Sequence, residues 1–398
     1  MHSRILIVGG GTAGITVAAA LTRKGVIGIS IIEPSEEHFY QPLWTLVGAG
    51  VVSKESTRRA EAGLIPKGVT WLRDRAKTFD PAANRAETEA SGAITYDFLV
   101  VAAGLQLDWG AIEGLEAALE TPNVSSIYDY RRSEETWQMI SSFDAGHALF
   151  NCPPMPIKCA GAPQKVAYMA ADHFRRSGKK DRCKISYATA LPIIFGVKEY
   201  AELLVGVADR HGIDVRYQHT LTGVDASAKE AIFKTQKGEE TQTERAPYDL
   251  LHVVPPQSAP DFIKQSPLAG DEGPATGWVE VDKNRLSHVR YDNVFGLGDV
   301  TNTPNAKTGA AIRHQAPVLV SNLMARMEDR ELEASYGGYG ACPLVTGYGK
   351  MLLAEFDYTG KPTPTLPIDT MRVRYSMWLL KRYGLPFAYW NFMMKGIT

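Results

Sequence analysis

The stretch "RILIVGGGTAG", residues 4–14, decides the fold. The run "RILIV" favours a short buried strand, and the small, apolar residues of "ITVAAALTRKG" after the glycines favour a helix. Gly9, Gly11 and Gly14 fit the spacing G-x-G-x-x-G between the two. Glycines there let the turn bend tightly and let the backbone approach a pyrophosphate, which the helix N-terminus stabilises. This order of strand, turn and helix predicts a dinucleotide-binding unit.

An acidic residue at the end of the next strand supports that interpretation. The strand "GISIIEP" ends at Glu33, where a carboxylate can accept hydrogen bonds from a ribose. These features fit NAD and FAD equally well. Two later stretches favour FAD, because the strand "YDFLVVAAG" ends in Gly104 and "NVFGLGDVTN" places Asp299 after another strand. Both are typical of flavoproteins with two dinucleotide domains, in which the aspartate holds the ribityl–phosphate region of FAD.

A second αβ unit lacks the features of a nucleotide site. After the strand "HALFN" the chain continues "CPPMPIKCAGAP" without a glycine fingerprint, and the strand "CKISYATA" ends without an acid for an NAD ribose. The predicted fold is therefore α/β, with two Rossmann-like domains and a C-terminal segment. We expect an FAD domain at 1–110 and 290–370, a degenerate NAD domain at 111–289 that carries Cys159, and a basic, aromatic segment at 371–398.

Composition and charge exclude several classes of function. The chain has 398 residues, 44% of them hydrophobic and 22% charged, with a net charge of −1, so no global field favours nucleic acid as a partner. Four cysteines do not make a disulfide scaffold and fit a reducing compartment. The nine histidines show no metal-ligand spacing, so no metal is expected. The start "MHSRILIVGGG" lacks a charged region followed by a long apolar run, so a cytoplasmic location is expected.

Two cysteines are candidates for redox chemistry. Cys159 precedes a helix that is expected to start near Pro163, and a helix N-terminus favours a thiolate. Cys342 is expected in a glycine- and tyrosine-rich loop before an apolar strand. Each could instead be a buried structural cysteine, which is how we interpret Cys152 and Cys183. Two thiols in a flavoprotein without an NAD site suggest a redox pair that faces the flavin.

Long blocks of the sequence closely resemble the sulfide:quinone oxidoreductases, in particular their type II (two-cysteine, mitochondrial) subgroup. The blocks run from residue 5 to the end of the chain: "EPSEEHFYQPLWTLVGAG", "PIKCAGAPQK", "FGVKEYA", "NVFGLGDVTN", "ACPLVTGYGKMLLAEFDY" and "PFAYWNFMMKG". The resemblance implies FAD between two Rossmann-like halves, with Cys159 and Cys342 as the redox pair. It also implies three reactants: sulfide, a quinone, and a thiol, sulfite or second sulfide that removes the sulfane sulfur.

The resemblance assigns further cofactor residues by motif. Thr12 and Ala13 lie in the pyrophosphate turn, Gln41 lies at the cofactor, and Ala76 lies where the backbone meets the adenine. Lys307 matches a lysine at the flavin ring, where a cation would stabilise reduced flavin. The third cysteine of the three-cysteine enzymes, expected around residues 110–135, does not occur, so FAD is expected to be held without a covalent bond.

The resemblance implies a thiol–disulfide mechanism. Hydrosulfide attacks a linked Cys159–Cys342 pair at Cys342, which leaves a persulfide there and a thiolate on Cys159. Exchange of this kind favours a low-pKa leaving thiol, which the helix N-terminus can supply. Electrons then pass from Cys159 through FAD to a quinone.

The C-terminal stretch "RVRYSMWLLKRYGLPFAYWNFMMKG" mixes basic and aromatic residues without an acid. Such a mixture suits a segment that lies in the headgroup region of an anionic membrane, which predicts a peripheral protein on the cytoplasmic side of the cell membrane. The other interpretation is an aromatic-rich helix packed on the flavin domain, and both can hold together.

Two rival functions remain open at this point. A type II NADH:quinone oxidoreductase shares the flavin fold but would need a working second nucleotide site. A sulfide- or redox-sensing flavoprotein could use the same cysteines and would turn over very slowly with excess quinone.

Overall fold

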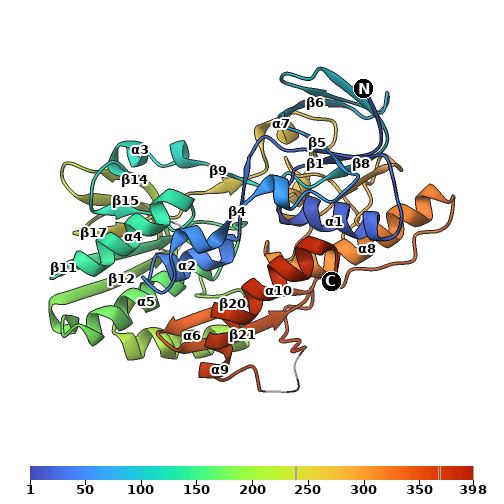
Figure 1. Ribbon diagram of the computed structural model, residues 1–398. Helices are drawn as coiled ribbons and strands as arrows, with labels where there is room; N and C mark the ends of the chain where they lie inside the picture. The colour runs from blue at the N-terminus through green and yellow to red at the C-terminus, as the bar shows by residue number, and fades with distance from the viewer. Residues whose placement is uncertain (238–239, 366, 368, 398) are drawn as a thin grey trace.

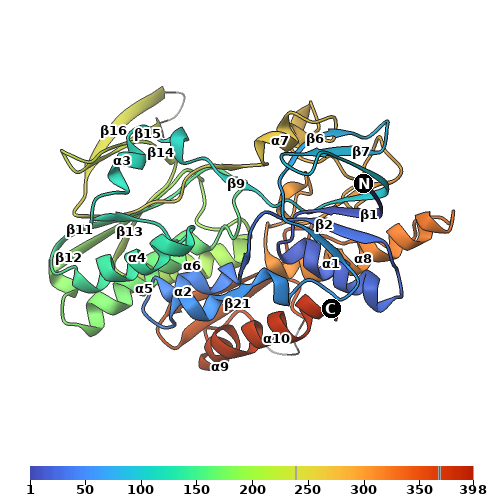
Figure 2. The same ribbon diagram turned by 45° about the horizontal axis from the view of Figure 1, so that its top comes forward.

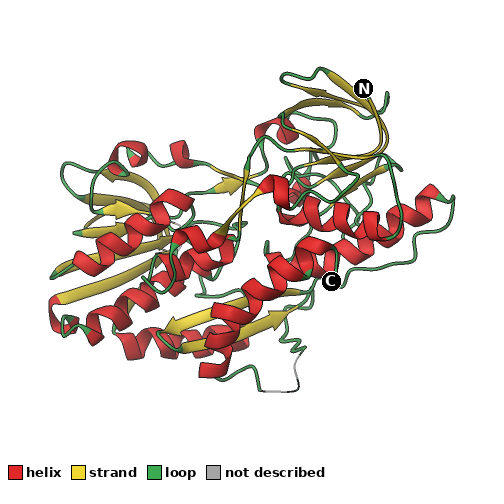
Figure 3. Ribbon diagram, viewed as in Figure 1, coloured by secondary structure: helices red, strands yellow, loops and turns green. Residues whose placement is uncertain are grey.

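The computed structural model describes residues 1–237, 240–365, 367 and 369–397, and within them the chain forms two lobes (Figure 1). Each lobe is built around a largely parallel sheet with helices packed on it (Figure 3). The two Rossmann-like units predicted from the glycine turn and the later strands are thereby confirmed.

The first sheet forms around β1 because its residues are buried on both faces. Parallel strands flank β1 on both sides, and two antiparallel strands extend one edge of the sheet. In sheet order the strands are β5 (Thr70–Leu72), β2 (Ile29–Ile32), β1 (His2–Val8), β8 (Ala93–Val101), β7 (Arg85–Thr88) and β6 (Ala76–Asp80). Strand β19 (Val294–Gly296) also pairs with β8. Helices α1 (Thr12–Arg23) and α8 (Gly309–Met327) pack side by side on it. Carboxyl ends of parallel strands meet at one edge, so the turn after β1 and the turn after β19 share that edge.

The second sheet is parallel throughout, in the order β10 (Val124–Ser125), β17 (Leu250–His252), β11 (Gly146–Cys152), β12 (Cys183–Thr189) and β13 (Ile213–Arg216). The helices of this lobe are α3 (Leu115–Ala118), α4 (Tyr130–Ser142), α5 (Ala162–Arg176) and α6 (Lys198–His211). A three-stranded antiparallel sheet lies beside it, with strands β14 (His219–Asp225), β15 (Glu230–Lys237) and β16 (Glu240–Pro247).

Short elements connect the lobes. β9 (Gln106–Leu107) pairs with β18 (Gln257–Ser258), and β3 (Glu37–Phe39) pairs with β4 (Arg58–Ala60). Helix α7 (Asp261–Lys264) follows β18, and its Ile263 packs in the core of the first sheet with Val279 and Val281. The domain limits given above remain a prediction. The packing of Ile263, Val279 and Val281 shows that part of the 111–289 range belongs to the core of the first lobe.

The last part of the chain lies between the lobes (Figures 1 and 2). A hairpin of β20 (Gly340–Gly347) and β21 (Lys350–Phe356) precedes three helical segments, namely α9 (Tyr375–Leu379), a π-helical turn (Leu380–Gly384) and α10 (Leu385–Asn391). Helix α2 spans Trp44–Val47. A final turn, Met393–Lys395, packs on α1. No helix in the described part of the chain is both long enough and apolar enough to span a bilayer.

Candidate functional site

The glycine turn has the backbone that the spacing requires. Gly9 has a φ of +104°, and a Cβ there would lie 2.5 Å from the carbonyl oxygen of Ala102, so a larger residue cannot fit. Gly14 is equally restricted, because its Cβ would meet the carbonyl oxygen of Gly9 at 1.9 Å. Gly11 caps α1 and faces open space, with nothing within 4 Å of a Cβ. An uncrowded helix N-terminus with free N–H groups fits the pyrophosphate of a dinucleotide.

Glu33 lies directly after β2 and bonds to backbone within the turn. Its two oxygens accept hydrogen bonds from the N–H groups of Gly10, at 2.8 Å, and Ser35, at 2.7 Å. Burial raises the pKa of Glu33 above its usual value, although the two N–H groups oppose that rise. Ala13 is buried in the first turn of α1, Ala76 begins β6, and Gly104 follows β8 with a φ of +69°.

Thr12 opens α1 and reaches a residue from the far end of the chain. Its Oγ1 lies 2.8 Å from the hydroxyl of Tyr389 in α10, and that hydroxyl lies 2.6 Å from Nε2 of His38. His38 Nδ1 lies 3.0 Å from Oε2 of Glu61, whose other oxygen is buried without a partner among the described residues. A buried polar chain therefore joins the cofactor turn to the C-terminal segment.

The two candidate redox cysteines come together although 183 positions separate them. The Sγ atoms of Cys159 and Cys342 lie 3.8 Å apart, as free thiols. Cys159 precedes α5, which begins at Ala162 close to the predicted start. Cys342 lies inside β20 rather than in a loop, which corrects the expectation from its glycine-rich surroundings. Gly161 leaves room for the pair, since a Cβ there would lie 2.6 Å from the Cys342 sulfur.

The loop that carries Cys159 is held in a strained conformation. Cys159 has a φ of +49°, a region that costs a residue other than glycine about 1–3 kcal/mol. Its N–H donates to the carbonyl of Lys307 at 2.9 Å, and its carbonyl accepts from the hydroxyl of Tyr128 at 3.2 Å. These contacts come from both lobes, so the thiol is fixed at the boundary between them.

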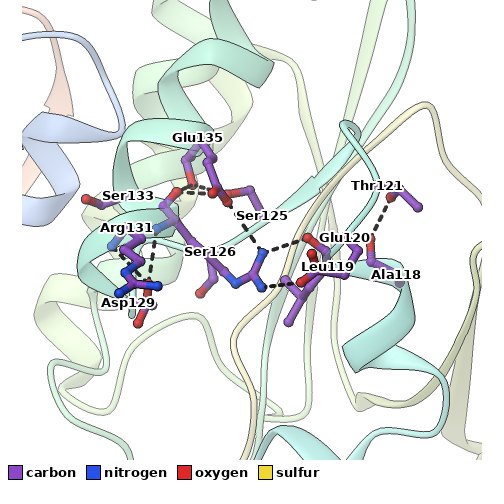
Figure 4. A network of polar contacts seen from close by, with 12 residues as sticks. Ala118, Leu119, Glu120, Thr121, Ser125, Ser126, Asp129, Arg131, Ser133 and Glu135 are labelled. Atoms are coloured by element: carbon purple, nitrogen blue, oxygen red, sulfur yellow. Dashed lines mark hydrogen bonds and ion pairs between the residues drawn. The ribbon is translucent and has the colours of Figure 1, made fainter.

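A polar network holds the start of α4, which follows Tyr128 in the chain (Figure 4). The carboxylate of Asp129 accepts hydrogen bonds from the N–H groups of Arg131 and Arg132 and so caps the helix. The guanidinium of Arg132 donates to the carbonyl of Leu119 at 2.6 Å, and its own carbonyl accepts from Ser125. The helix start and the strand before it are thus fixed on both sides of Tyr128.

Two buried lysines that the sequence did not reveal face the sulfurs. The Nζ of Lys165, in α5, lies 3.2 Å from Cys159 Sγ and 3.7 Å from Cys342 Sγ, and only 1% of the residue is exposed. Lys381, also 1% exposed, comes from the π-helical turn and donates to the carbonyl of Pro42. The sequence did contain a sign that Lys165 is buried: it lies six positions after Cys159, in a predicted helix whose next residues are almost all apolar. Lys381 had no such signal, because only the folded C-terminal segment brings it to the site.

These charges make the two thiols different. A hydrogen bond from the Cys342 thiol, together with the Lys165 charge, holds the pKa of Cys159 well below its usual range. The same hydrogen bond, with burial, raises the pKa of Cys342. Burial opposes the charge of Lys165, yet the two sulfurs raise the pKa of that ammonium above its usual value. Burial and repulsion from Lys165 lower the pKa of Lys381 to about 7. Cys159 is therefore the more acidic of the two thiols.

Three more predicted residues lie by the loop that carries Cys159. Gln41 accepts a hydrogen bond from Lys158 at 2.8 Å, next to Cys159 in the chain. The ammonium of Lys307 donates to the carbonyls of Asp299 and Thr301 and lies 4.0 Å from the centre of the Trp278 ring. Burial lowers the pKa of Lys307 to about 8 and raises the pKa of the Asp299 carboxyl. Gln41 and Lys307 thus contact the loop that carries Cys159, and the charge of Asp299 is felt from that cysteine.

Cys152 and Cys183 lie apart from the pair. Both are buried in strands, β11 and β12, and burial raises the pKa of each thiol, for Cys152 to about 11. A buried, neutral thiol is a poor nucleophile. In the described residues, no three His, Cys, Asp or Glu side chains are grouped so that they could hold a metal ion.

Comparison with known proteins agrees with this geometry. Residues 3–139 match the family described as pyridine nucleotide-disulphide oxidoreductase. Over 397 residues the chain is 43% identical to the mitochondrial sulfide:quinone oxidoreductase of Mus musculus, with 99% of this chain and 87% of the relative covered. The chain belongs to the sulfide:quinone oxidoreductase family. The mitochondrial sulfide:quinone oxidoreductase of Dictyostelium discoideum is also 43% identical, over 99% of this chain and 86% of the relative.

A solved member of the family has the same fold. The crystal structure of the sulfide:quinone oxidoreductase from Aquifex aeolicus superposes with a TM-score of 0.80 at 21% identity, and covers 99% of this chain and 92% of that one. Sulfide:quinone oxidoreductases are FAD-dependent oxidoreductases, so FAD is the cofactor of this chain. The glycine turn, the open N-terminus of α1 and the partnerless buried oxygen of Glu61 fit such a group.

Proposed function

We propose that this protein oxidises sulfide at Cys342 and Cys159 and passes the electrons to a quinone. The observation that carries the proposal is the Lys165 ammonium between two sulfurs 3.8 Å apart. A protonated lysine at that place stabilises a thiolate on either cysteine, which is what a thiol–disulfide exchange needs.

The reaction begins from the bonded pair, with an Sγ–Sγ distance of about 2.05 Å, which the two thiols form by losing two protons and giving two electrons to the bound cofactor. Hydrosulfide attacks Sγ of Cys342, the Cys159–Cys342 bond breaks, and Cys342 becomes a persulfide while Cys159 leaves as a thiolate. Lys165 favours this direction because the low pKa of Cys159 makes it the better leaving group. A nucleophilic acceptor, such as a thiol, sulfite or a second sulfide, then takes the outer sulfur and leaves Cys342 as a thiolate.

Closing the pair again releases two electrons. We propose that FAD is held by the residues that the glycine turn and the family resemblance single out. They are Gly9, Gly11, Thr12, Ala13, Gly14, Glu33, Gln41, Ala76, Gly104, Asp299 and Lys307. Bound FAD would supply a two-electron acceptor for the cysteine pair and an electron donor for the quinone. The chain itself keeps the thiolate beside a cation and buries Cys342 from water.

We further propose that the protein attaches peripherally to the cytoplasmic side of the cell membrane, where its quinone is dissolved. The C-terminal segment supports this attachment with large exposed apolar side chains, among them Tyr375, Tyr383 and Phe387. Other members of that segment, including Trp378 and Tyr389, are buried in the core, so the segment both packs and presents a surface.

The first test adds sulfide, and separately NADH, to the anaerobic holoprotein and follows the flavin absorbance. We expect sulfide to bleach the flavin and a soluble quinone to restore it. Bleaching by NADH alone would contradict the proposal and favour an NADH:quinone oxidoreductase. No restoration by excess quinone would favour a sensor.

The second test replaces each cysteine of the pair. Cys159→Ser and Cys342→Ser should each lower sulfide-driven bleaching by at least about a hundredfold while FAD stays bound, since the exchange needs both sulfurs. Cys183→Ser is the matched control, because its thiol lies outside the site. Full activity in either pair variant would refute the scheme.

A further inference from the structure

A hollow beside the C-terminal segment combines cations with aromatic rings. It has a volume of about 560 Å3, and six side chains form most of its wall: Arg176, Lys350, Arg382, Tyr348, Tyr375 and Trp378. The three cations come from different elements, namely the end of α5, the start of β21 and the π-helical turn. Folding therefore brings together charges that the sequence keeps far apart.

The positive charge of this hollow is only partly neutralised. The carboxylate of Asp172 is shared between Arg175 and Arg176. Lys350 makes no ion pair within the described part of the chain. The Nε atom of Arg382 is buried and has no hydrogen-bond partner there, while its Nη2 makes only a 3.4 Å contact with the carbonyl of Val51. The guanidinium of Arg382 therefore retains donors that the described residues leave unused, and Arg382 lines the hollow.

The hollow borders an exposed apolar stripe. Every fourth residue of the segment is large and exposed: Tyr375 by 64%, Leu379 by 38%, Tyr383 by 57% and Phe387 by 60%. These four exposed side chains recur along α9, the π-helical turn and α10, and together they make up the apolar stripe. Tyr375 belongs to both the stripe and the wall of the hollow. A ligand in the hollow would thus lie at the edge of whatever apolar medium covers the stripe.

We propose that the hollow binds the phosphate of an anionic phospholipid headgroup while the stripe enters the membrane interface. Arginine donates paired hydrogen bonds to phosphate oxygens, and lysine adds a compact positive charge. Tyrosine is enriched at the level of the headgroups, which matches Tyr375 and Tyr348 in the wall, whereas Trp378 belongs to the core. The inference rests on the proposed membrane attachment and adds a specific lipid site to it.

The test is flotation of the holoprotein with vesicles of phosphatidylcholine, alone or mixed with phosphatidylglycerol. The double variant Lys350→Gln/Arg382→Gln removes two charges from the hollow. The control Arg372→Gln/Lys395→Gln removes two charges from the C-terminal segment that lie outside the hollow. Both variants lose diffuse attraction, but only the first loses direct hydrogen bonds, so its affinity for the mixed vesicles should fall at least about tenfold more than that of the control.

Several outcomes would overturn the headgroup site. The first is an equal loss of vesicle affinity in the two variants. The second is equal binding of the wild type to both vesicle types. The third is competition by inorganic phosphate: if phosphate at the concentration of the lipid phosphate abolishes flotation, the hollow binds phosphate without regard to the lipid. If the wild type floats with neither vesicle, the membrane attachment itself is wrong. Sulfide bleaching of the flavin should be unchanged in every variant, which separates this inference from the proposed reaction.

Discussion

Lys165 is the single residue that we expect to set the reactivity of Cys159, because its ammonium lies 3.2 Å from that sulfur. Lys165→Met keeps the bulk of the side chain and removes the charge. The pKa of Cys159 should then rise, and alkylation of Cys159 by iodoacetamide below neutral pH should slow by about tenfold or more. The direction of this effect follows because the thiolate is the reactive form. In the wild type, Cys159 keeps reacting as the pH falls, until the pH drops below the lowered pKa of Cys159.

The measurement is the pH profile of labelling in the reduced holoprotein, read at Cys159 by mass spectrometry. Lys184→Met is the control, since Lys184 is an exposed lysine on β12 and should leave the profile unchanged. A Lys165→Met profile that superposes on the wild type would show that Lys165 does not stabilise the thiolate.

For single residues, the sequence predicts site residues whose role depends on their neighbours in the chain. It misses site residues whose role depends on packing between distant segments. Cys159 could be singled out because a helix start follows it within a few residues, and Gly9 and Gly14 because their spacing is fixed by the turn. Lys381 could not, since a lysine in a basic, aromatic stretch is normally a solvated residue. Its burial depends on the C-terminal segment folding between the lobes, which brings Lys381 near Lys165 and both sulfurs.

At the scale of elements, α10 is expected to help retain the cofactor. The hydroxyl of Tyr389 lies 2.8 Å from Thr12 Oγ1 and 2.6 Å from His38 Nε2, so it ties the helix to the first residue of α1. Tyr389→Phe removes one buried hydroxyl and leaves two partners unpaired, which costs about 1 kcal/mol or more. We expect FAD to bind roughly fivefold more weakly, measured by flavin fluorescence as FAD is added back to the apoprotein.

The control for this prediction is Tyr383→Phe, because Tyr383 is 57% exposed and lies in the same segment. It should bind FAD as the wild type does. If Tyr389→Phe also retained full affinity, the polar chain from Thr12 to Glu61 would be a structural link without influence on the cofactor.

The elements themselves show where periodicity suffices. The first strand, the glycine turn and α1 follow from a buried run and small residues, and the structure confirms them at Val8 and Thr12. Cys342 was expected in a loop because glycine and tyrosine surround it, yet β20 includes it since β21 pairs with it across the hairpin. Ala354, which pairs with Cys342, lies on the returning strand of the hairpin, so the propensities of the few residues next to Cys342 do not show the pairing.

For the whole molecule, the C-terminal segment has two roles that a deletion would confuse. Removal of all residues from 375 onward would take away the exposed stripe, but also Trp378, Lys381, Tyr389 and Met393, which are buried. Loss of several core side chains costs about 2–5 kcal/mol each. We therefore expect the truncated chain to lose FAD and to melt at a lower temperature, so its failure to bind liposomes would say little about the membrane.

Substitution within the stripe separates the two roles. Tyr383→Ser/Phe387→Ser removes two exposed rings and leaves the buried residues in place, so FAD content and sulfide oxidation with a soluble quinone should stay as in the wild type. Burial of an aromatic side chain in an apolar medium contributes about 1.5–3 kcal/mol, so liposome affinity should fall by at least about tenfold in sedimentation. The control Ile27→Ser/Val289→Ser removes two exposed apolar side chains elsewhere on the surface and should sediment normally. Unchanged sedimentation of the stripe variant would mean that the segment only packs on the fold, and that the quinone is reached from another face.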